Sequence, residues 1–347
     1  MTVRIINADC REALRQLDAG SVHCCVTSPP YFGLRDYENP SQIGLEPTPD
    51  EFVEAMVTVF REVRRVLRGD GTLWLNLGDS YCSTDKWGGG GNIGKQTRAD
   101  DGEVPSWAVR RKRQAMEGIK PKDLIGIPWM VAFALRADGW FLRSEVVWAK
   151  PNGMPGSQQD RCTSSHEAVF LLTKKAAYWS DFDAIKTPPR ESTLIRKAQD
   201  VQAQAGSHRA NGGAKTNGPM KAVGGIDKQR GHSRRHAGFN DRWDAMEKAE
   251  QQSKPAMMRD VWFVPPGGYD EAHFAVMPEE IARRCVLAGC PYGGTVLDPF
   301  GGAGTTGLVA DRLGRDAVLT ELNPKYVAMA RARIERDGGM FTQVEAA

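Results

Sequence analysis

Short apolar runs and polar segments alternate over the first thirty residues. The run 5–9 begins with two isoleucines and ends in Asp9, and the run 22–26 is apolar apart from His23. Runs of this length predict short strands, the second of them buried. Segment 11–17 between them is predicted as a helix with Asp9 as its N-terminal cap.

A longer helix and another strand follow. The apolar residues of 51–67 recur at helical spacing, which predicts a helix with one face on a sheet and Asp50 as its cap. Residues 71–79 alternate between glycine ends and predict a strand beside 22–26. These elements together predict an α/β fold.

A strand–turn–helix pattern stands near the C-terminus. Residues 296–297 begin a buried strand, the glycine-rich turn 301–307 opens a helix at 308–313, and the strand 317–320 precedes Glu321. Glycines let a ligand approach the backbone, and the first amides of a helix have no intrahelical partner. A carboxylate at such a strand end commonly accepts hydrogen bonds from both ribose hydroxyls. This region therefore predicts a nucleoside-cofactor site.

The spacing Gly302-x-Gly304-x-x-Gly307 also satisfies the dinucleotide fingerprint of dehydrogenases. A dehydrogenase, however, builds its doubly wound sheet after that fingerprint. Here only about forty residues follow Gly307, room for about one more helix. The rest of the sheet must come from the N-terminal part, so the pattern predicts a circularly permuted Rossmann-like sheet with helices on both faces.

The turn Thr27-Ser28-Pro29-Pro30-Tyr31 follows the apolar run 22–26. Two prolines fix the backbone and remove two amide donors, so nearby carbonyls can face a ligand. Ser28 adds a hydroxyl, and Tyr31 adds a ring face for stacking. The turn is suited to hold a planar amine.

The two turns, in this order, resemble those of S-adenosylmethionine-dependent DNA amino-methyltransferases of the permuted (beta) group, and the likeness spans most of the chain. Three further segments are similar to the family: Trp148-x-Lys150-Pro151, Ser165-His166-Glu167 and His273-Phe274-Ala275-x-Met277-Pro278. The resemblance implies S-adenosylmethionine as cofactor, no metal, and a catalytic turn of Ser28, Pro29, Pro30 and Tyr31. It also implies these cofactor-binding residues: Asp9, Asp298, Pro299, Phe300, Gly302, Gly304, Thr305, Thr306, Glu321 and Asn323.

The chemistry of such an enzyme follows from its substrate. An exocyclic amine of a base is a poor nucleophile because its lone pair is delocalised, so acceptors such as Ser28 Oγ and the Pro29 carbonyl should favour its pyramidal form. The base must leave the duplex to reach such a pocket, and Tyr31 is the candidate to stack on it. Methylation of cytosine carbon-5 would require a cysteine after a proline, and the sequence contains no Pro-Cys pair.

The identity of the amine rests on Ser28. Within the family, Ser-Pro-Pro-Tyr is commonest in N4-cytosine enzymes and aspartate at the first position is usual in N6-adenine enzymes. We therefore expect N4-cytosine methylation, with N6-adenine as the alternative and RNA or protein amines as more remote ones. His166 and Glu167 are predicted to be structural, since one histidine at the start of an element seldom forms an acid/base pair.

Charge is unevenly distributed over the 347 residues. Segment 186–259 holds 15 Lys or Arg and seven Asp or Glu, and the remainder is net acidic although the whole chain carries +3. The segment is also rich in Gly, Asn, Gln and Ser. It reads either as a disordered linker or as a target-recognition region for duplex DNA. The second interpretation assigns DNA contacts to four residues: Arg234, Arg235, Asn240 and Arg242.

A second insertion, 83–122, contains four successive glycines and a basic run. That run is either a solvated face or a contact to the DNA backbone. DNA binding would be carried by Arg110, Arg111, Lys112 and Arg113. The predicted domain order is thus 1–82 and 123–185 for the catalytic half, 83–122 and 186–259 for the insertions, and 260–347 for the cofactor half.

Composition indicates where in the cell the protein is expected to act. No apolar run reaches the length of a membrane span, no signal peptide is recognisable, and seven cysteines without a Cys-x-x-Cys pair argue against disulfides or a zinc site. We expect a cytoplasmic enzyme of prokaryotic or phage origin that acts on double-stranded DNA. Family members often pair as dimers, so a homodimer is also expected.

Overall fold

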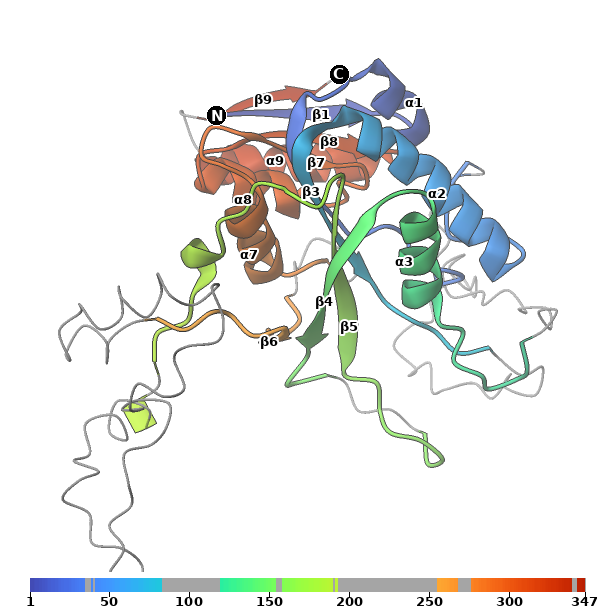
Figure 1. Ribbon diagram of the computed structural model, residues 1–347. Coiled ribbons are helices and arrows are strands. Elements are labelled where there is room, and N and C mark those ends of the chain that lie inside the picture. The colour runs from blue at the N-terminus through green and yellow to red at the C-terminus, as the bar shows by residue number, and fades with distance from the viewer. Residues whose placement is uncertain are drawn as a thin grey trace, which may run out of the picture. The chain divides into compact units, whose positions relative to one another are not determined.

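The structure is a computed structural model (Figure 1), which describes residues 1–34, 39, 41–82, 119–153, 158–189, 191–192, 255–267, 276–338 and 342–346. Within these ranges nine strands form one sheet, in the order β6-β4-β5-β3-β2-β7-β8-β1-β9. Strand β5 is antiparallel to its neighbours β3 and β4, and the other pairs are parallel. The elements are β1 (Thr2–Asn7), α1 (Cys10–Gln16), β2 (Val22–Thr27), α2 (Pro49–Val66), β3 (Leu67–Leu77), α3 (Ile127–Ala137), β4 (Phe141–Ala149), β5 (His166–Thr173), the 3-10 helix η3 (Phe182–Ile185), β6 (Val261–Phe263), α7 (Glu279–Gly289), β7 (Thr295–Asp298), α8 (Thr305–Arg312), β8 (Asp316–Glu321), α9 (Pro324–Gly338) and β9 (Gln343–Ala346).

The strand order confirms the permuted fold. Strands β7 and β8, from the C-terminal part of the chain, lie between β2 and β1 of the N-terminal part. Cys25 of β2 pairs with Leu297 of β7, and Ile5 of β1 pairs with Leu319 of β8. The two ends of the sequence therefore build one continuous sheet.

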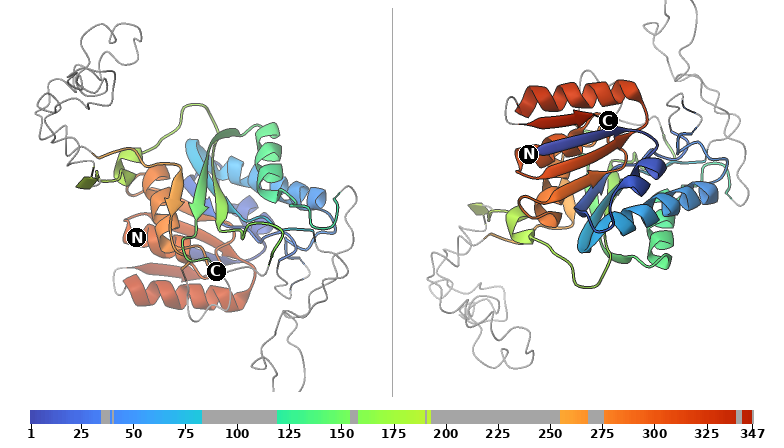
Figure 2. Two further views of the ribbon diagram at one scale, coloured as in Figure 1. Left: turned by 90° about the horizontal axis from the view of Figure 1, so that it is seen from below. Right: turned by 90° about the horizontal axis from the view of Figure 1, so that it is seen from above.

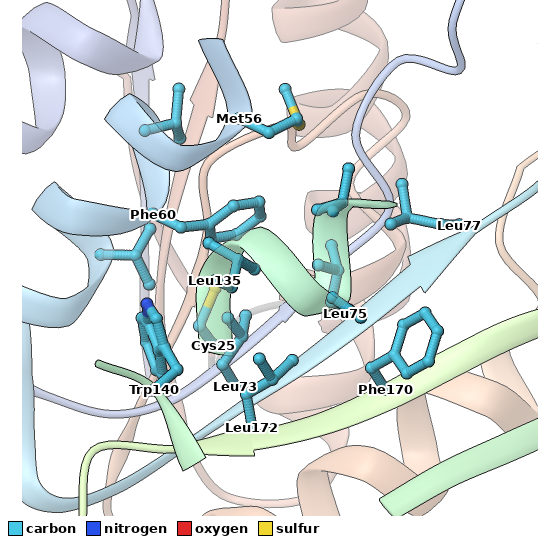
Figure 3. Close-up of a cluster of buried hydrophobic side chains, with 14 of the residues drawn as sticks. Cys25, Met56, Phe60, Leu73, Leu75, Leu77, Leu135, Trp140, Phe170 and Leu172 are labelled. Atoms are coloured by element: carbon cyan, nitrogen blue, oxygen red, sulfur yellow. The ribbon is translucent and has the colours of Figure 1, made fainter. Parts of the chain in front are cut away.

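Helices cover both faces of this sheet, with α1, α2 and α3 in one layer and α7, α8 and α9 in the other (Figure 2). Successive side chains of a strand point to opposite faces. Cys25, Leu73 and Leu75 accordingly pack with the first layer, in the cluster of Figure 3. Cys24 instead lies against Gly289 of α7. Burial on both faces explains why these strands are almost continuously apolar.

The predicted helices are confirmed, with one correction at α2. Its N-terminal cap is Thr48, whose hydroxyl accepts a hydrogen bond from the Glu51 amide at 3.2 Å, and the expectation that Asp50 caps it was wrong. Pro49 occupies the first helical position, where its fixed φ is favourable and its missing amide costs nothing. The helix thus begins before Asp50.

The chain separates into two compact units, residues 1–185 with 259–347 and residues 186–258. The sheet belongs to the first unit. In the second, Thr187 and Ala256 form an isolated antiparallel bridge. The expected target-recognition region 186–259 stays a prediction, because most of it lies outside the described residues. Among the described helices, none is both long and apolar enough to cross a membrane.

Candidate active site

A cavity opens at the carboxyl ends of four adjacent parallel strands, β2, β7, β8 and β1. The cavity has a volume of about 180 Å³. Open α/β sheets bind ligands at this edge. Of the residues expected in the site, eleven line the cavity: Asp9, Ser28, Pro30, Asp298, Pro299, Phe300, Gly302, Thr305, Thr306, Glu321 and Asn323. Residues from both ends of the sequence therefore meet around one space.

The glycine turn after β7 adopts backbone conformations that favour glycine. Gly302 and Gly304 have φ values of 50° and 78°, in the left-handed region that favours glycine. Gly304 is the N-terminal cap of α8, and its amide donates to the Gly301 carbonyl at 2.8 Å. A Cβ on Gly304 would lie 2.8 Å from the Ala330 Cβ of α9. The turn thus leaves its outer side open to a ligand while α9 packs closely behind it.

Glu321, the last residue of β8, lies next to the glycine turn and lines the same cavity. Its carboxylate oxygens accept hydrogen bonds from the Gly302 and Asn323 amides, each at 2.8 Å. Burial raises the pKa of Glu321 above its ordinary 4.5. Each carboxylate oxygen has a second lone pair. Glu321 can therefore still accept hydrogen bonds from hydroxyls of a ligand in the cavity.

Asp298 joins the glycine turn to the turn 27–31, which contains the predicted catalytic residues. Its Oδ1 accepts hydrogen bonds from Thr27 Oγ1 at 2.6 Å and from the Phe300 amide at 3.0 Å, and its Oδ2 accepts from Thr306 Oγ1 at 2.7 Å. Burial raises the pKa of this carboxyl above its ordinary 3.8. Because Thr27 directly precedes Ser28, these contacts fix the position of Ser28 relative to the glycine turn.

Asp9 caps α1 as predicted, and it also lines the cavity. Its Oδ1 accepts from the Arg11 amide at 2.8 Å, and both its oxygens accept from the Arg11 guanidinium. Burial alone would raise the pKa of Asp9, but the hydrogen bonds and charge of Arg11 outweigh it and hold that pKa below its ordinary value. An anionic Asp9 can accept a hydrogen bond from an amine in the cavity.

The Tyr31 hydroxyl is bound by residues of two other strands, β3 and β5. It donates to Glu167 Oε2 at 2.5 Å and lies 3.1 Å from Asn76 Oδ1. Asn76 stands near the end of β3, and Glu167 near the start of β5. Lys150, just after β4, forms a short ion pair with Glu167 Oε1. Glu167, which the sequence predicted as structural only, thus touches the catalytic turn.

Sequence reasoning did not single out several residues at the site. Asn76 was part of a predicted strand, and Lys150 and Glu167 appeared in motifs without an assigned role. Tyr326, Ile43 and Met277 also line the cavity. The eight basic or amide residues expected to bind DNA, and His273 to Ala275, lie outside the described residues.

Comparison with known proteins identifies the family of the chain. Residues 22–332 match the DNA methylase family (N6_N4_Mtase). The chain belongs to this DNA methylase family. Two relatives are the type II methyltransferase M.SmaI of Serratia marcescens, 39% identical with 96% of this chain and 91% of the relative covered, and M.Cfr9I of Citrobacter freundii, 39% identical with 99% and 91% covered.

Solved structures share the fold of this DNA methylase. The PvuII DNA methyltransferase, cytosine-N4-specific, superposes with a TM-score of 0.57 at 14% identity over 99% of this chain and 96% of that one. A provisionally assigned DNA modification methylase of Thermus thermophilus, complexed with S-adenosyl-L-methionine, gives 0.53 at 21% identity over 99% of both chains. S-adenosylmethionine is the cofactor of this family of enzymes. The open glycine turn, the buried carboxylate of Asp298 and the half-buried carboxylate of Glu321 fit a nucleoside with a charged amino-acid end.

Proposed function

We propose that this DNA methylase transfers a methyl group from S-adenosylmethionine to the exocyclic N4 amine of a cytosine flipped out of duplex DNA. The observation that carries the proposal is the position of Ser28, which lines the same cavity as Asp298 and Glu321. A hydroxyl suited to an amine thus faces the space where a cofactor fits.

The residues of the catalytic turn would act by accepting hydrogen bonds. Ser28 Oγ and the Pro29 carbonyl accept from the amine hydrogens, which favours the pyramidal amine. The cofactor supplies a sulfonium-bound methyl group that is already activated. The chain therefore has to position the amine and exclude water, without a covalent intermediate on the enzyme.

Ser28 could also contact the ring of a flipped cytosine. A hydroxyl both donates and accepts, whereas a carboxylate only accepts, so Ser28 can also donate to cytosine N3. The PvuII enzyme, which shares the fold, is cytosine-N4-specific. Adenine N1 offers a similar acceptor, which makes N6-adenine the alternative for the experiment to separate.

We also propose that the insertions bind the DNA. Residues 186–259 would recognise the target through Arg234, Arg235, Asn240 and Arg242, and the basic run 110–113 in 83–122 would contact the backbone. Lys and Arg side chains provide the phosphate contacts that dominate affinity for DNA, while base contacts provide specificity.

The test is to incubate the purified protein with unmethylated duplex DNA and methyl-labelled S-adenosylmethionine, and to identify the labelled nucleoside by mass spectrometry. We expect N4-methylcytosine. The Ser28→Ala variant should lose roughly 100-fold or more in rate, because one preorganised hydrogen bond is removed. Its affinity for the cofactor, measured by calorimetry, should stay close to that of the wild type.

The other outcomes change the assignment in defined ways. Label on N6-methyladenine would keep the catalytic turn and overturn the base. Cofactor binding without label on DNA would point to RNA or protein amines. Full activity of Ser28→Ala would contradict the proposed role of the catalytic turn.

A further inference from the structure

We infer that Glu167, held in place by Asn76 and Lys150, is a positioning residue that fixes the Tyr31 ring for methyl transfer. The inference rests on the proposed function, because it takes Tyr31 as the ring that stacks on the flipped base. It assigns a task to a carboxylate that is not expected to touch either substrate.

The Tyr31 hydroxyl has one preferred hydrogen-bond acceptor. A phenol has one proton and a carboxylate only accepts. The contact to Glu167 Oε2 at 2.5 Å is in the range of charge-assisted hydrogen bonds, while Asn76 Oδ1 is farther away at 3.1 Å. The proton therefore points toward Glu167, which sets the direction of the hydroxyl.

Glu167 is itself held from two sides. Asn76 Nδ2 donates to Glu167 Oε2 and to the Ala168 carbonyl, both at 3.2 Å, which also fixes the orientation of the Asn76 amide. Lys150 binds the other carboxylate oxygen, and its ammonium lies 4.6 Å from the centre of the Trp148 ring. The side chains of Glu167 and Lys150 are 13% and 23% exposed. This degree of burial makes their pairing less sensitive to solvent screening than that of a surface pair.

The ring of Tyr31 is confined as well. A Cβ on Gly78 would lie 2.5 Å from Tyr31 Cε2 and 2.9 Å from Cδ2, so one edge of the ring packs directly on the Gly78 backbone. With its hydroxyl bound and its edge packed, the ring has little freedom to turn about its axis. A stacking platform that is already oriented lowers the cost of bringing the base into a reactive geometry.

The network has a clear structural origin. Tyr31 lies four residues after β2, Asn76 is the last residue but one of β3, Lys150 directly follows β4 and Glu167 is the second residue of β5. Because β5 is antiparallel to β3 and β4, its start lies at the edge where those strands end. The reversed strand thus brings a carboxylate to the catalytic side of the sheet.

The experiment is a double-mutant cycle with Tyr31→Phe and Glu167→Gln. Both variants keep the shape of the side chain, and the first removes the hydroxyl while the second removes the charge. Single-turnover transfer of labelled methyl to the accepting nucleic acid is measured, irrespective of the base, so that product release does not mask the chemical step. The matched control is Glu335→Gln, which removes a carboxylate from the exposed Arg331–Glu335 pair of α9.

We expect each single variant to slow the transfer roughly 10- to 100-fold, as a small misplacement of a reacting group does. Cofactor affinity and melting temperature should stay near wild type, and Glu335→Gln should transfer at the wild-type rate. If Glu167 acts through the Tyr31 hydroxyl, the double variant should be no more than about twofold slower than the slower single variant.

Two results would overturn the inference: a Glu167→Gln rate within about twofold of wild type, or single effects that multiply in the double variant. Ser28→Ala measured in parallel separates this failure from that of the proposed function. A slow Ser28→Ala with a fast Glu167→Gln would overturn only the inference, whereas a fast Ser28→Ala would contradict the catalytic turn itself.

Discussion

The two turns that meet in the cavity are fixed in different ways. The glycine turn, 299–304, which is the predicted cofactor turn, takes its shape from left-handed glycines, and its Phe300 and Gly302 amides donate to the carboxylates of Asp298 and Glu321 on the two adjacent strands. The catalytic turn, 27–31, is fixed by its side chains, through Thr27 to Asp298 and through Tyr31 to Glu167. The turn after β7 is thus held by residues close to it in the sequence, whereas the turn after β2 depends on strands far from it in the sequence.

The difference is clearest at two glycines. Position 304 requires glycine because its φ is 78° and because Ala330 packs too closely against it for a side chain to fit. Gly78 needs no unusual backbone conformation, and its missing Cβ makes room for the Tyr31 ring. Replacing each by alanine should therefore damage a different function.

Gly304→Ala should have the largest effect. Its Cβ would lie 2.8 Å from the Ala330 Cβ and 3.1 Å from the Ala330 Cα, so helix α9 itself would have to shift. Together with the unfavourable φ we expect a loss of roughly 2–4 kcal/mol of unfolding free energy and a large loss of cofactor affinity. Chemical denaturation and calorimetry check the two effects.

Gly20→Ala is the matched control. Gly20 has a similar φ of 72°, but no atom lies within 4 Å of its added Cβ. We expect a loss of about 1 kcal/mol and unchanged cofactor affinity. Equal losses for both variants would show that backbone strain alone, and not the packing of α9 behind the turn, makes Gly304 necessary.

Asp298→Asn should have the next largest effect, and mainly on binding. The variant keeps the shape of the side chain but loses the charge that accepts from the Thr27 and Thr306 hydroxyls and that lines the cavity proposed to hold the cofactor. We expect cofactor affinity to fall roughly 10- to 100-fold, the size of a hydrogen bond to a charged group. The free protein should lose roughly 1–2 kcal/mol of unfolding free energy, because an asparagine amide has one acceptor oxygen for the three donors that Asp298 accepts from, while removal of the buried charge offsets part of that loss. A melting temperature far below wild type with unchanged affinity would contradict this assignment.

The same contrast explains what the sequence could predict. The cofactor turn was recognisable because Asp298, Gly302 and Gly304 stand within a few residues, and local backbone geometry demands those residue types. The Pro-Pro turn was recognisable for the same reason. The permuted order of the sheet then followed from the small number of residues after Gly307, and the strand order confirmed it.

The network around Tyr31 could not be predicted in this way. Asn76, Lys150 and Glu167 come from three strands, and only the antiparallel direction of β5 brings Glu167 to the catalytic edge. Single polar residues at strand ends have many structural uses, so Glu167 carried no distinctive signal. The cap of α2 was misassigned for a simpler reason. Thr48 and Asp50 are both residue types that cap helices, and they stand only two positions apart.

Gly78→Ala should have a smaller effect, and one confined to catalysis. Its Cβ would displace the Tyr31 ring, whose side chain can move more easily than the backbone of α9. We expect a rate of single-turnover transfer about tenfold lower with cofactor affinity near wild type. Gly153→Ala is the control, since its Cβ would make only an ordinary contact of 3.7 Å with the Lys150 carbonyl. If Gly78→Ala weakened cofactor binding instead, the separation between the two turns would be wrong.

The smallest expected effect is the pH dependence that Glu321 gives to stability and to cofactor affinity. Burial raises the pKa of Glu321, so its folded pKa lies above the ordinary 4.5 of the unfolded chain. In the window between these two values the folded state binds the proton more tightly, so this group's contribution to stability rises as pH falls through the raised pKa. Cofactor affinity moves the other way, because protonated Glu321 is a weaker acceptor for hydroxyls.

Glu321→Gln, which does not titrate, isolates this contribution. As pH falls through the raised pKa, the unfolding free energy of wild type should increase relative to Glu321→Gln, while its advantage in cofactor affinity should shrink by a few-fold at most. Denaturation and calorimetry at a series of pH values measure both quantities. A wild-type affinity advantage that does not change with pH would mean that the Gly302 and Asn323 amides, and not a ligand, use the charge of Glu321.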